Sequence, residues 1–196
     1  MPWFNEMIKA GPQGRGIDRR ETTAPISRPA ENRVELYRTL YAERAALPAE
    51  DPRKVDLERV RTFIITSSRV ADDDGVLLPD GGDFALFDTN PIILWGHQSD
   101  VRLGRGLDRR RITTPVDGWE MDIEFAPASA SEDAEECFRF IEWAGFAACS
   151  MRFDVTEGDF RPRPEDIIKY GLPRFGWIGK KWRLKEVSIC SLPCDS

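Results

Sequence analysis

Apolar and polar residues alternate in several segments after residue 56, which is typical of strands with one buried face. Residues 119–125 (WEMDIEF) show this alternation most clearly, and residues 59–69 (RVRTFIITSSR) are rich in β-branched and aromatic side chains. Further strands are predicted over residues 146–153 and 182–192, and an apolar run over residues 91–97 (PIILWGH) ends at a histidine. This part of the chain is therefore expected to be mainly β.

One helix is predicted between these strands, because both of its ends can be recognised. Ser129 or Ser131 can accept hydrogen bonds from the free amides at its start. Gly145 can adopt the left-handed conformation that ends a helix. The apolar face of this helix is expected to consist of Ala134, Cys137, Phe138 and Ile141.

Residues 1–55 differ from the rest, because glycine and proline punctuate a polar sequence. Within them, residues 31–47 (ENRVELYRTLYAERAAL) place apolar residues at helical spacing. We expect an N-terminal arm over residues 1–55 with one amphipathic helix, followed by one domain over residues 56–196. The helix either packs on that domain, docks to a partner, or belongs to a removable pro-segment.

Composition and charge narrow the class of protein. The chain has 196 residues, of which 41% are hydrophobic and 32% charged, as in a globular domain. Its formal net charge of −6 argues against nucleic-acid binding by the whole molecule. No apolar run approaches the ~20 residues that cross a bilayer, and the first residues lack the apolar core of a secretory signal. We therefore expect a cytoplasmic protein.

The four cysteines and the single histidine give no metal-site pattern. No C-x-x-C pair is present, and no second histidine could complete a zinc site. We expect reduced thiols, no bound metal and no cofactor.

Three residues could form a nucleophilic site. A serine hydroxyl needs a neighbouring base, and an imidazole base needs a group, commonly a carboxylate, that orients it. If their strands lie side by side, Ser150 could be the nucleophile, His97 the general base and Glu186 the orienting group. The same three residues also fit a structural histidine, an ordinary strand serine and an edge-strand glutamate.

Four motifs in this order resemble the prohead protease family of tailed phages. Residues 90–97 (NPIILWGH) match an "NP-apolar-LW-x-H" segment, and a glycine-marked "G-R" element follows at residues 104–105. After the glycine-ended helix, residues 148–153 (ACSMRF) match a small-small-Ser-x-x-Phe strand. Residues 186–189 (EVSI), with Pro193 soon after, match the closing strand. The resemblance covers roughly residues 58–194.

The resemblance implies an α+β, mainly β fold, with a small β-barrel surrounded by helices as in the herpesvirus assemblin proteases. It implies a serine endopeptidase that cleaves scaffold polypeptides, the major capsid protein precursor and itself inside the assembling prohead, in the cytoplasm of the bacterial host. His97 and Ser150 would be base and nucleophile, and Glu186 stands where the herpesvirus enzymes have a second histidine. A homo-oligomer is compatible with this assignment, whereas neither a membrane nor nucleic acid is expected as a partner. The alternative is a non-catalytic structural or scaffold-associated assembly protein that retains the fold.

Two residues near these three also need an interpretation. Arg152 stands where many family members have glycine, and it could stabilise an oxyanion, bind substrate or neutralise a nearby acid. Ser188 is a competing nucleophile, but the family carries its nucleophile on the strand after the glycine-ended helix, which favours Ser150.

A basic, aromatic stretch over residues 161–185 holds eight Lys and Arg against two acids. We expect a loop that either covers the barrel and contacts acidic scaffold or capsid segments, or is simply solvated. Binding of nucleic acid to this stretch is a weaker hypothesis, because the whole chain is acidic.

Overall fold

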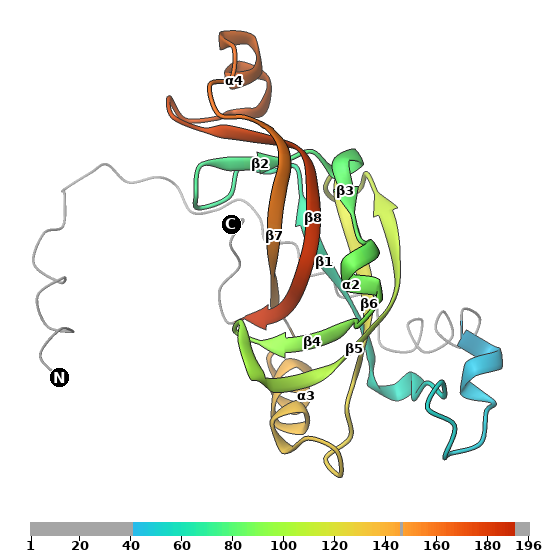
Figure 1. Cartoon of the computed structure of the whole chain (residues 1–196). Helices are drawn as coiled ribbons and strands as arrows, with labels where there is room; N and C mark the ends of the chain where they lie inside the picture. The colour runs from blue at the N-terminus through green and yellow to red at the C-terminus, as the bar shows by residue number, and fades with distance from the viewer. Residues whose placement is uncertain (1–40, 146, 191–196) are drawn as a thin grey trace, which may run out of the picture.

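The computed structural model describes residues 41–145 and 147–190. Figure 1 shows its elements, which in chain order are η1 (Leu57–Arg59), β1 (Val60–Ser67), β2 (Gly75–Leu77), η2 (Pro79–Gly81), β3 (Gly82–Asp83), α2 (Ala85–Asp88), β4 (Ile92–Trp95), β5 (Gln98–Ile112), β6 (Gly118–Phe125), α3 (Glu132–Ala144), β7 (Ala148–Asp159), α4 (Pro164–Tyr170) and β8 (Trp177–Cys190). Residues 41–45 are helical as well, whereas the rest of the predicted helix over residues 31–47 lies largely outside the described residues.

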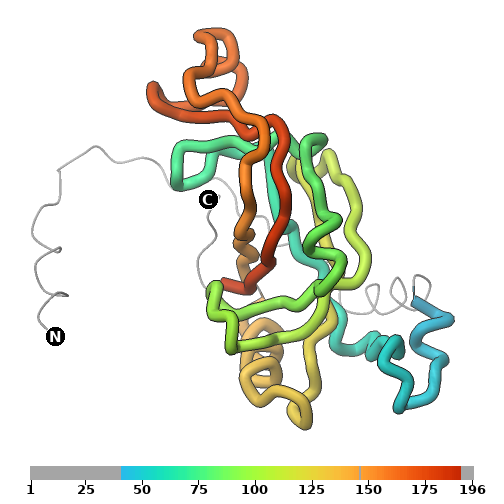
Figure 2. Tube along the Cα trace, in the orientation of Figure 1, coloured from blue at the N-terminus to red at the C-terminus, as the bar shows by residue number. Residues whose placement is uncertain are grey.

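The strands of this part of the chain form a single curled sheet that makes a half-barrel (Figures 1 and 2). Its order is β1-β6-β5-β4-β8-β2, and β3 and β7 also pair with β8. Strand β7 runs antiparallel along one edge of β8, while β2, β3 and β4 lie parallel along the other edge. The structure is therefore mixed α+β with strands predominating, as the sequence predicts.

The core lies inside the curled sheet and is closed at one end by α3. The alternation over residues 119–125 is confirmed, since Met121, Ile123 and Phe125 are at most 1% exposed. The predicted helix is confirmed too: the Ser131 hydroxyl accepts from the Ala134 amide at 3.1 Å, and Gly145 ends the helix at φ 74°. Among the described residues, no helix is long and apolar enough to cross a membrane.

The outer face of β6 is also covered, which the sequence pattern did not predict. Asp122 points away from the core but is fully buried under Tyr41, whose hydroxyl donates to it at 2.6 Å. Arg110 donates two hydrogen bonds to the same carboxylate at 2.7 and 2.8 Å, and Thr62 donates one at 2.7 Å. Tyr41 also packs with Val55 and Val60 in a small second core. This end of the arm therefore packs on the sheet.

The segment between the last two predicted strands is not the loop that the sequence suggested. Strand β7 continues to Asp159, α4 follows, and β8 already begins at Trp177. The two strands form a long antiparallel pair that carries α4 at its tip (Figure 1). The prolines of this segment, with Gly171 and Gly176, lie in the connection that contains α4, whereas Gly158 and Gly179 lie in the two strands. The aromatic residue Trp177 is the first residue of β8.

Candidate active site

The three candidate strands lie side by side with β8 in the middle. Ser150 on β7 pairs directly with Ser188 on β8, and the next same-face pair is Arg152 with Glu186. On the other edge of β8, Leu94 of β4 pairs with Ser188 as well. The end of β4 is thereby brought next to both Ser150 and Glu186.

His97 lies in the tight turn between β4 and β5, not in the strand where we expected it. Trp95 pairs with Gln98, so Gly96 and His97 form a two-residue hairpin loop with φ of 52° and 65°. Positive φ at both central residues is the requirement of the type I′ hairpin. The Gly96 amide donates to the Ile189 carbonyl at 2.9 Å, which ties the turn to β8. The backbone of the turn that carries the imidazole is thereby attached to β8.

The imidazole of His97 bridges the other two side chains. Its Nδ1 is 2.7 Å from Glu186 Oε1, and its Nε2 is 2.9 Å from Ser150 Oγ. An ionised carboxylate can only accept, so Nδ1 carries a proton, and in the neutral imidazole Nε2 then accepts from the Ser150 hydroxyl. This is the tautomer that a general base needs. The structure thus brings together all three residues selected from the sequence.

A β-bulge at Lys185 places Glu186 on the face of Ser150. Arg152 pairs with Glu186 and the next residue, Phe153, pairs with Leu184, so Lys185 is the extra residue of β8. Before the bulge the even-numbered Trp182 and Leu184 face the core, and after it the odd-numbered Val187 and Ile189 do. The core-facing side chains of β8 therefore continue to face the core on both sides of the bulge, and Glu186 faces the opposite side of the sheet. Bulges commonly re-aim side chains next to active sites.

Ser188 connects the base to the carboxylate, a role that the sequence did not reveal. Its hydroxyl donates to Glu186 Oε1 at 2.8 Å and accepts from the His97 amide at 3.1 Å. It is fully buried. The same-face spacing of Glu186 and Ser188 was the available sign, but it could not show that Ser188 faces the backbone of His97. The hydroxyl that lies against the imidazole Nε2 is that of Ser150, which supports Ser150 over Ser188 as the nucleophile.

Replacing Ser188 by alanine should slow acylation of Ser150 about 10- to 100-fold, because the partly buried amide of His97 and the carboxylate of Glu186 both lose their hydrogen bond to the hydroxyl. A lost hydrogen bond to a charged group costs about 1.5–3 kcal/mol. Ester hydrolysis and urea denaturation would be measured together. Ser131→Ala is the matched control, since it removes the N-cap of α3, which should lower the free energy of unfolding by about 1 kcal/mol, and leaves the site intact. If the two variants lose equal stability and equal activity, Ser188 has no positioning role.

Arg152 lies beside the carboxylate rather than beside the serine hydroxyl. Its Nη1 is 3.5 Å from Glu186 Oε2, and 58% of its side chain is exposed. Of the three roles considered for Arg152, the structure shows partial neutralisation of an acid. Because Oε1 faces His97 and Ser188, the guanidinium contacts the other oxygen and leaves their geometry undisturbed.

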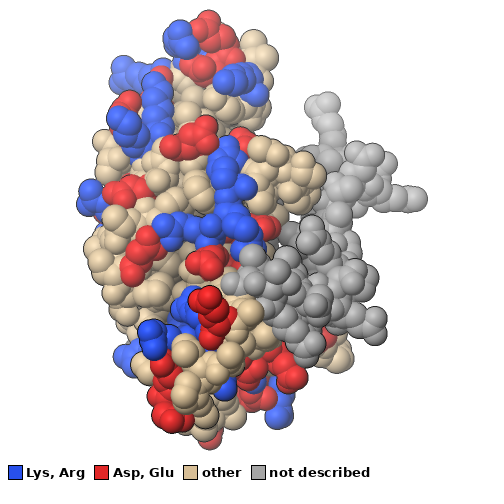
Figure 3. Space-filling model, turned by 90° about the vertical axis from the view of Figure 1, so that its right-hand side faces the viewer, with Lys and Arg blue, Asp and Glu red and all other residues tan. Residues whose placement is uncertain are grey.

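The basic stretch is matched by acids of the same protein. Its ion-paired cations are Arg163, Lys180, Lys181, Arg183 and Lys185. The partners of the four cations on β8 belong to β7 or β3, and the two partners of Arg163, Glu165 and Asp166, belong to α4. Over the face in Figure 3, positive and negative side chains are interspersed, including at the end that carries α4. This favours a solvated surface over a basic docking site.

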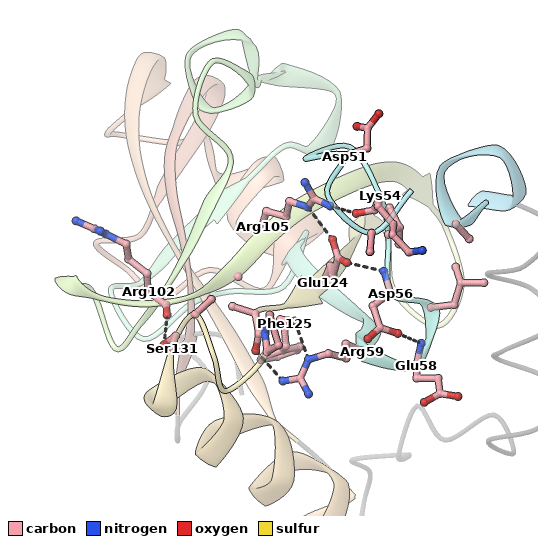
Figure 4. Close-up of a pocket in the computed structure, with 18 of the residues that line it drawn as sticks. Asp51, Lys54, Asp56, Glu58, Arg59, Arg102, Arg105, Glu124, Phe125 and Ser131 are labelled. Atoms are coloured by element: carbon pink, nitrogen blue, oxygen red, sulfur yellow. Dashed lines mark hydrogen bonds and ion pairs between the residues drawn. The ribbon is translucent and has the colours of Figure 1, made fainter. Parts of the chain in front are cut away.

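A cavity of about 900 Å³ lies away from these three residues, between residues 45–59 and strands β5 and β6 (Figure 4). Its polar groups are used to hold the chain in place: Arg105 binds Glu124 at 2.7 Å, and Glu124 accepts from the Asp56 amide at 2.6 Å. Arg59 donates to two carbonyls at 2.9 and 2.7 Å. Its lining has no nucleophile with a neighbouring base, whereas Ser150 has one in His97. The candidate active site is therefore the one at Ser150.

Comparison with known proteins gives no independent assignment. No protein family, curated protein or solved structure matches the chain. The interpretation of the site therefore depends on its geometry and on the sequence motifs.

Proposed function

We propose that this protein is a serine endopeptidase with Ser150 as nucleophile, His97 as general base and Glu186 as the group that orients the base. The observation that carries the proposal is the continuous hydrogen-bonded line from Glu186 Oε1 through the imidazole to Ser150 Oγ, with separations of 2.7 and 2.9 Å. The three groups come from three neighbouring segments of the sheet, which is the arrangement that positions reacting groups rigidly.

The reaction follows from these contacts. Ser150 Oγ attacks a peptide carbonyl while its proton passes to His97 Nε2. The positive charge on the imidazole is stabilised by Glu186. His97 then gives the proton to the leaving amine, and an acyl group remains on Ser150. Water, deprotonated by the same imidazole, releases the acyl group and regenerates the hydroxyl.

The biological setting is proposed from the sequence motifs. We infer that the half-barrel corresponds to the assemblin-like barrel of prohead proteases. The substrates would be scaffold polypeptides, the major capsid protein precursor and this chain itself, inside the assembling prohead in the bacterial cytoplasm. The low exposure of Ser150, 4%, favours a second candidate, a structural assembly protein that keeps the fold without catalysis.

Reaction with a fluorophosphonate separates these two candidates. The purified protein should gain the mass of one adduct, located on Ser150, because only an activated serine displaces the fluoride. The Ser150→Ala variant should gain none. An unlabelled wild-type protein, or equal labelling of both proteins, would contradict the proposed nucleophile.

Co-expression with its own capsid and scaffold partners tests the substrates. Defined cuts, measured by intact mass, should appear with wild type and vanish with Ser150→Ala. If the partner proteins have the same masses with wild type and with Ser150→Ala, and shells still assemble, the endopeptidase proposal is contradicted and the structural role is supported.

A further inference from the structure

The register of the strands shows which residues share the outer face of the sheet with the candidate active site. Ser150 pairs with Ser188, which pairs with Leu94 of β4 on the other edge of β8. Leu94 pairs in turn with Arg102 of β5. Directly paired residues point to the same side of a sheet, so Arg102 lies on the face that carries Ser150.

The residues that face the core support this assignment. Ile93 pairs with Val187, and both are fully buried. The side chains of Ile92 and Leu94, on either side of Ile93 along β4, therefore point to the outer face, where each is partly exposed. Ile92 pairs with Arg105 of β5, which lies on the outer face as well. Apolar surface is thus left next to the candidate active site.

The cavity of about 900 Å³ opens on this same face. It is lined by Arg102, and by Arg105 and Glu124, which pair with each other across β5 and β6. Its opposite wall consists of residues 45–59 (Figure 4). The end of the arm and the candidate active site therefore border the same side of the sheet.

An extended peptide can connect the two places. Neighbouring strands lie about 4.8 Å apart, so the three steps from β7 through β8 and β4 to β5 place Arg102 about 14 Å from Ser150 along the sheet. About four residues of extended chain cover this distance.

The lining combines apolar walls with a cation that has no partner. Its apolar residues are Ala45, Ala49, Val55, Leu57, Ile92, Phe125, Ala126, Pro127 and Ala130. The guanidinium groups of Arg59 and Arg105 are used within the protein. The side chain of Arg102 forms no hydrogen bond or ion pair in the described part of the chain, and it is directed away from Arg105 and Glu124 (Figure 4).

We propose that this cavity is a second binding site for the substrate, and that it takes a segment about four to six residues from the scissile bond. The inference rests on the proposed function, because it assigns a further part of the substrate to the same enzyme. An acidic side chain of the segment would pair with Arg102, and a large apolar side chain would enter the cavity. Alternate side chains of an extended peptide share a face, so the acidic residue would be the fourth and the apolar residue about the sixth.

Quenched fluorescent peptides with a central ester bond test the proposal. Ser150 Oγ forms the acyl bond, the alcohol half leaves with the proton passed on by His97, and water releases the acyl half. One peptide has Glu and Phe at the fourth and sixth positions on the acyl side, a second has them on the leaving side, and a third has Gln and Ala on both sides. One of the first two should have a kcat/KM about 10- to 100-fold above the third, through a lower KM, which is the effect of burying one Phe side chain.

Reversing the charge of Arg102 should reverse the preference at the fourth position. Wild type should cleave the Glu peptide about two- to fivefold faster than the same peptide with Lys there, and Arg102→Glu should prefer Lys. Arg174→Glu is the matched control, because it makes the same charge change at an exposed residue that does not line the cavity. It should keep the preference for Glu.

Narrowing the cavity should remove the preference for Phe at the sixth position. Ala130 and Ala128 are exposed residues of the same loop, but only Ala130 lines the cavity. Ala130→Trp should abolish the advantage of Phe over Ala, whereas Ala128→Trp should keep it.

Labelling of wild-type Ser150 with a fluorophosphonate separates this inference from the proposed function. If Ser150 is labelled but the three peptides are cleaved at equal rates or not at all, the second site is refuted and the reactive serine stands. If Arg102→Glu and Ala130→Trp keep the wild-type preferences, the peptide binds elsewhere and the inference is overturned. If Ser150 is not labelled, the proposed function fails, and the second substrate site fails with it.

Discussion

The Glu186→Gln variant should acylate Ser150 about 10⁴-fold more slowly than wild type, the size of effect seen when a triad carboxylate becomes an amide. The carboxylate accepts from His97 Nδ1 and from the Ser188 hydroxyl through the same oxygen, Oε1. An amide offers one oxygen and one NH₂ group, so it cannot present acceptors on both sides.

Either orientation of that amide impairs the base. With its NH₂ group toward His97 Nδ1, the amide forces the imidazole proton onto Nε2, where the proton of Ser150 has to be received. With its oxygen toward His97 Nδ1 and the Ser188 hydroxyl, it turns its NH₂ group toward Arg152, which can only donate. The variant also loses the negative charge that stabilises the imidazolium.

Rates of phosphonate labelling and ester hydrolysis would measure this effect, with thermal unfolding as a check on folding. Glu157→Gln is the control, because Glu157 also lies on the β7–β8 pair but binds the exposed Lys181. It should keep wild-type rates. Activity of Glu186→Gln within tenfold of wild type would show that the carboxylate does not orient the base.

Replacing Asp122 by alanine should lower the free energy of unfolding by about 3–5 kcal/mol, as expected when one partner of a buried ion pair is removed. Arg110, Tyr41 and Thr62 all lose their common acceptor in this variant. Urea denaturation would measure the loss. Glu120→Ala is the control, because Glu120 binds the same Arg110 at 3.0 Å but remains partly exposed. This variant should lower the free energy of unfolding by at most about 1 kcal/mol. Equal losses in the two variants would contradict the buried network.

The stabilisation by Asp122 should also depend on pH. Burial alone raises the pKa of Asp122, but hydrogen bonds from Arg110, Tyr41 and Thr62 outweigh it and hold the pKa below its ordinary value of 3.8. A lowered folded-state pKa gives stability that is complete above the unfolded pKa and is lost as pH falls through the folded value. The difference in stability between wild type and Asp122→Asn should therefore be constant near neutral pH and shrink below about pH 4.

Local patterns predicted the elements that depend on neighbouring residues alone. The α3 helix begins at the cap Ser131 and ends at Gly145. Strand β6 follows its apolar alternation, and β1 forms in the segment that is rich in β-branched and aromatic residues. The shared face of Glu186 and Ser188 also follows from strand periodicity. What the sequence could not show was that β4, β7 and β8 lie together, since strand order is set by contacts between distant segments.

Other features escaped prediction for the same reason. The bulge in β8 is visible in retrospect, because the alternation changes phase where the polar residues Lys185 and Glu186 adjoin. The burial of Asp122 depends on Tyr41, 81 positions away.

The pairing of β8 on both edges has a consequence for local unfolding. Opening of a segment is least frequent where backbone hydrogen bonds are shielded on both sides. Glu186 and Ser150 belong to the long β7–β8 pair, whereas His97 lies at the tip of the β4–β5 hairpin. This tip lies beyond the short pairing of β4 with β8 and is tied to β8 by the Gly96 amide and the Ser188 hydroxyl. The tip can therefore detach while the β7–β8 pair persists. The nucleophile and the carboxylate would then remain in a folded protein without a base, so catalytic competence would be lost before the fold is.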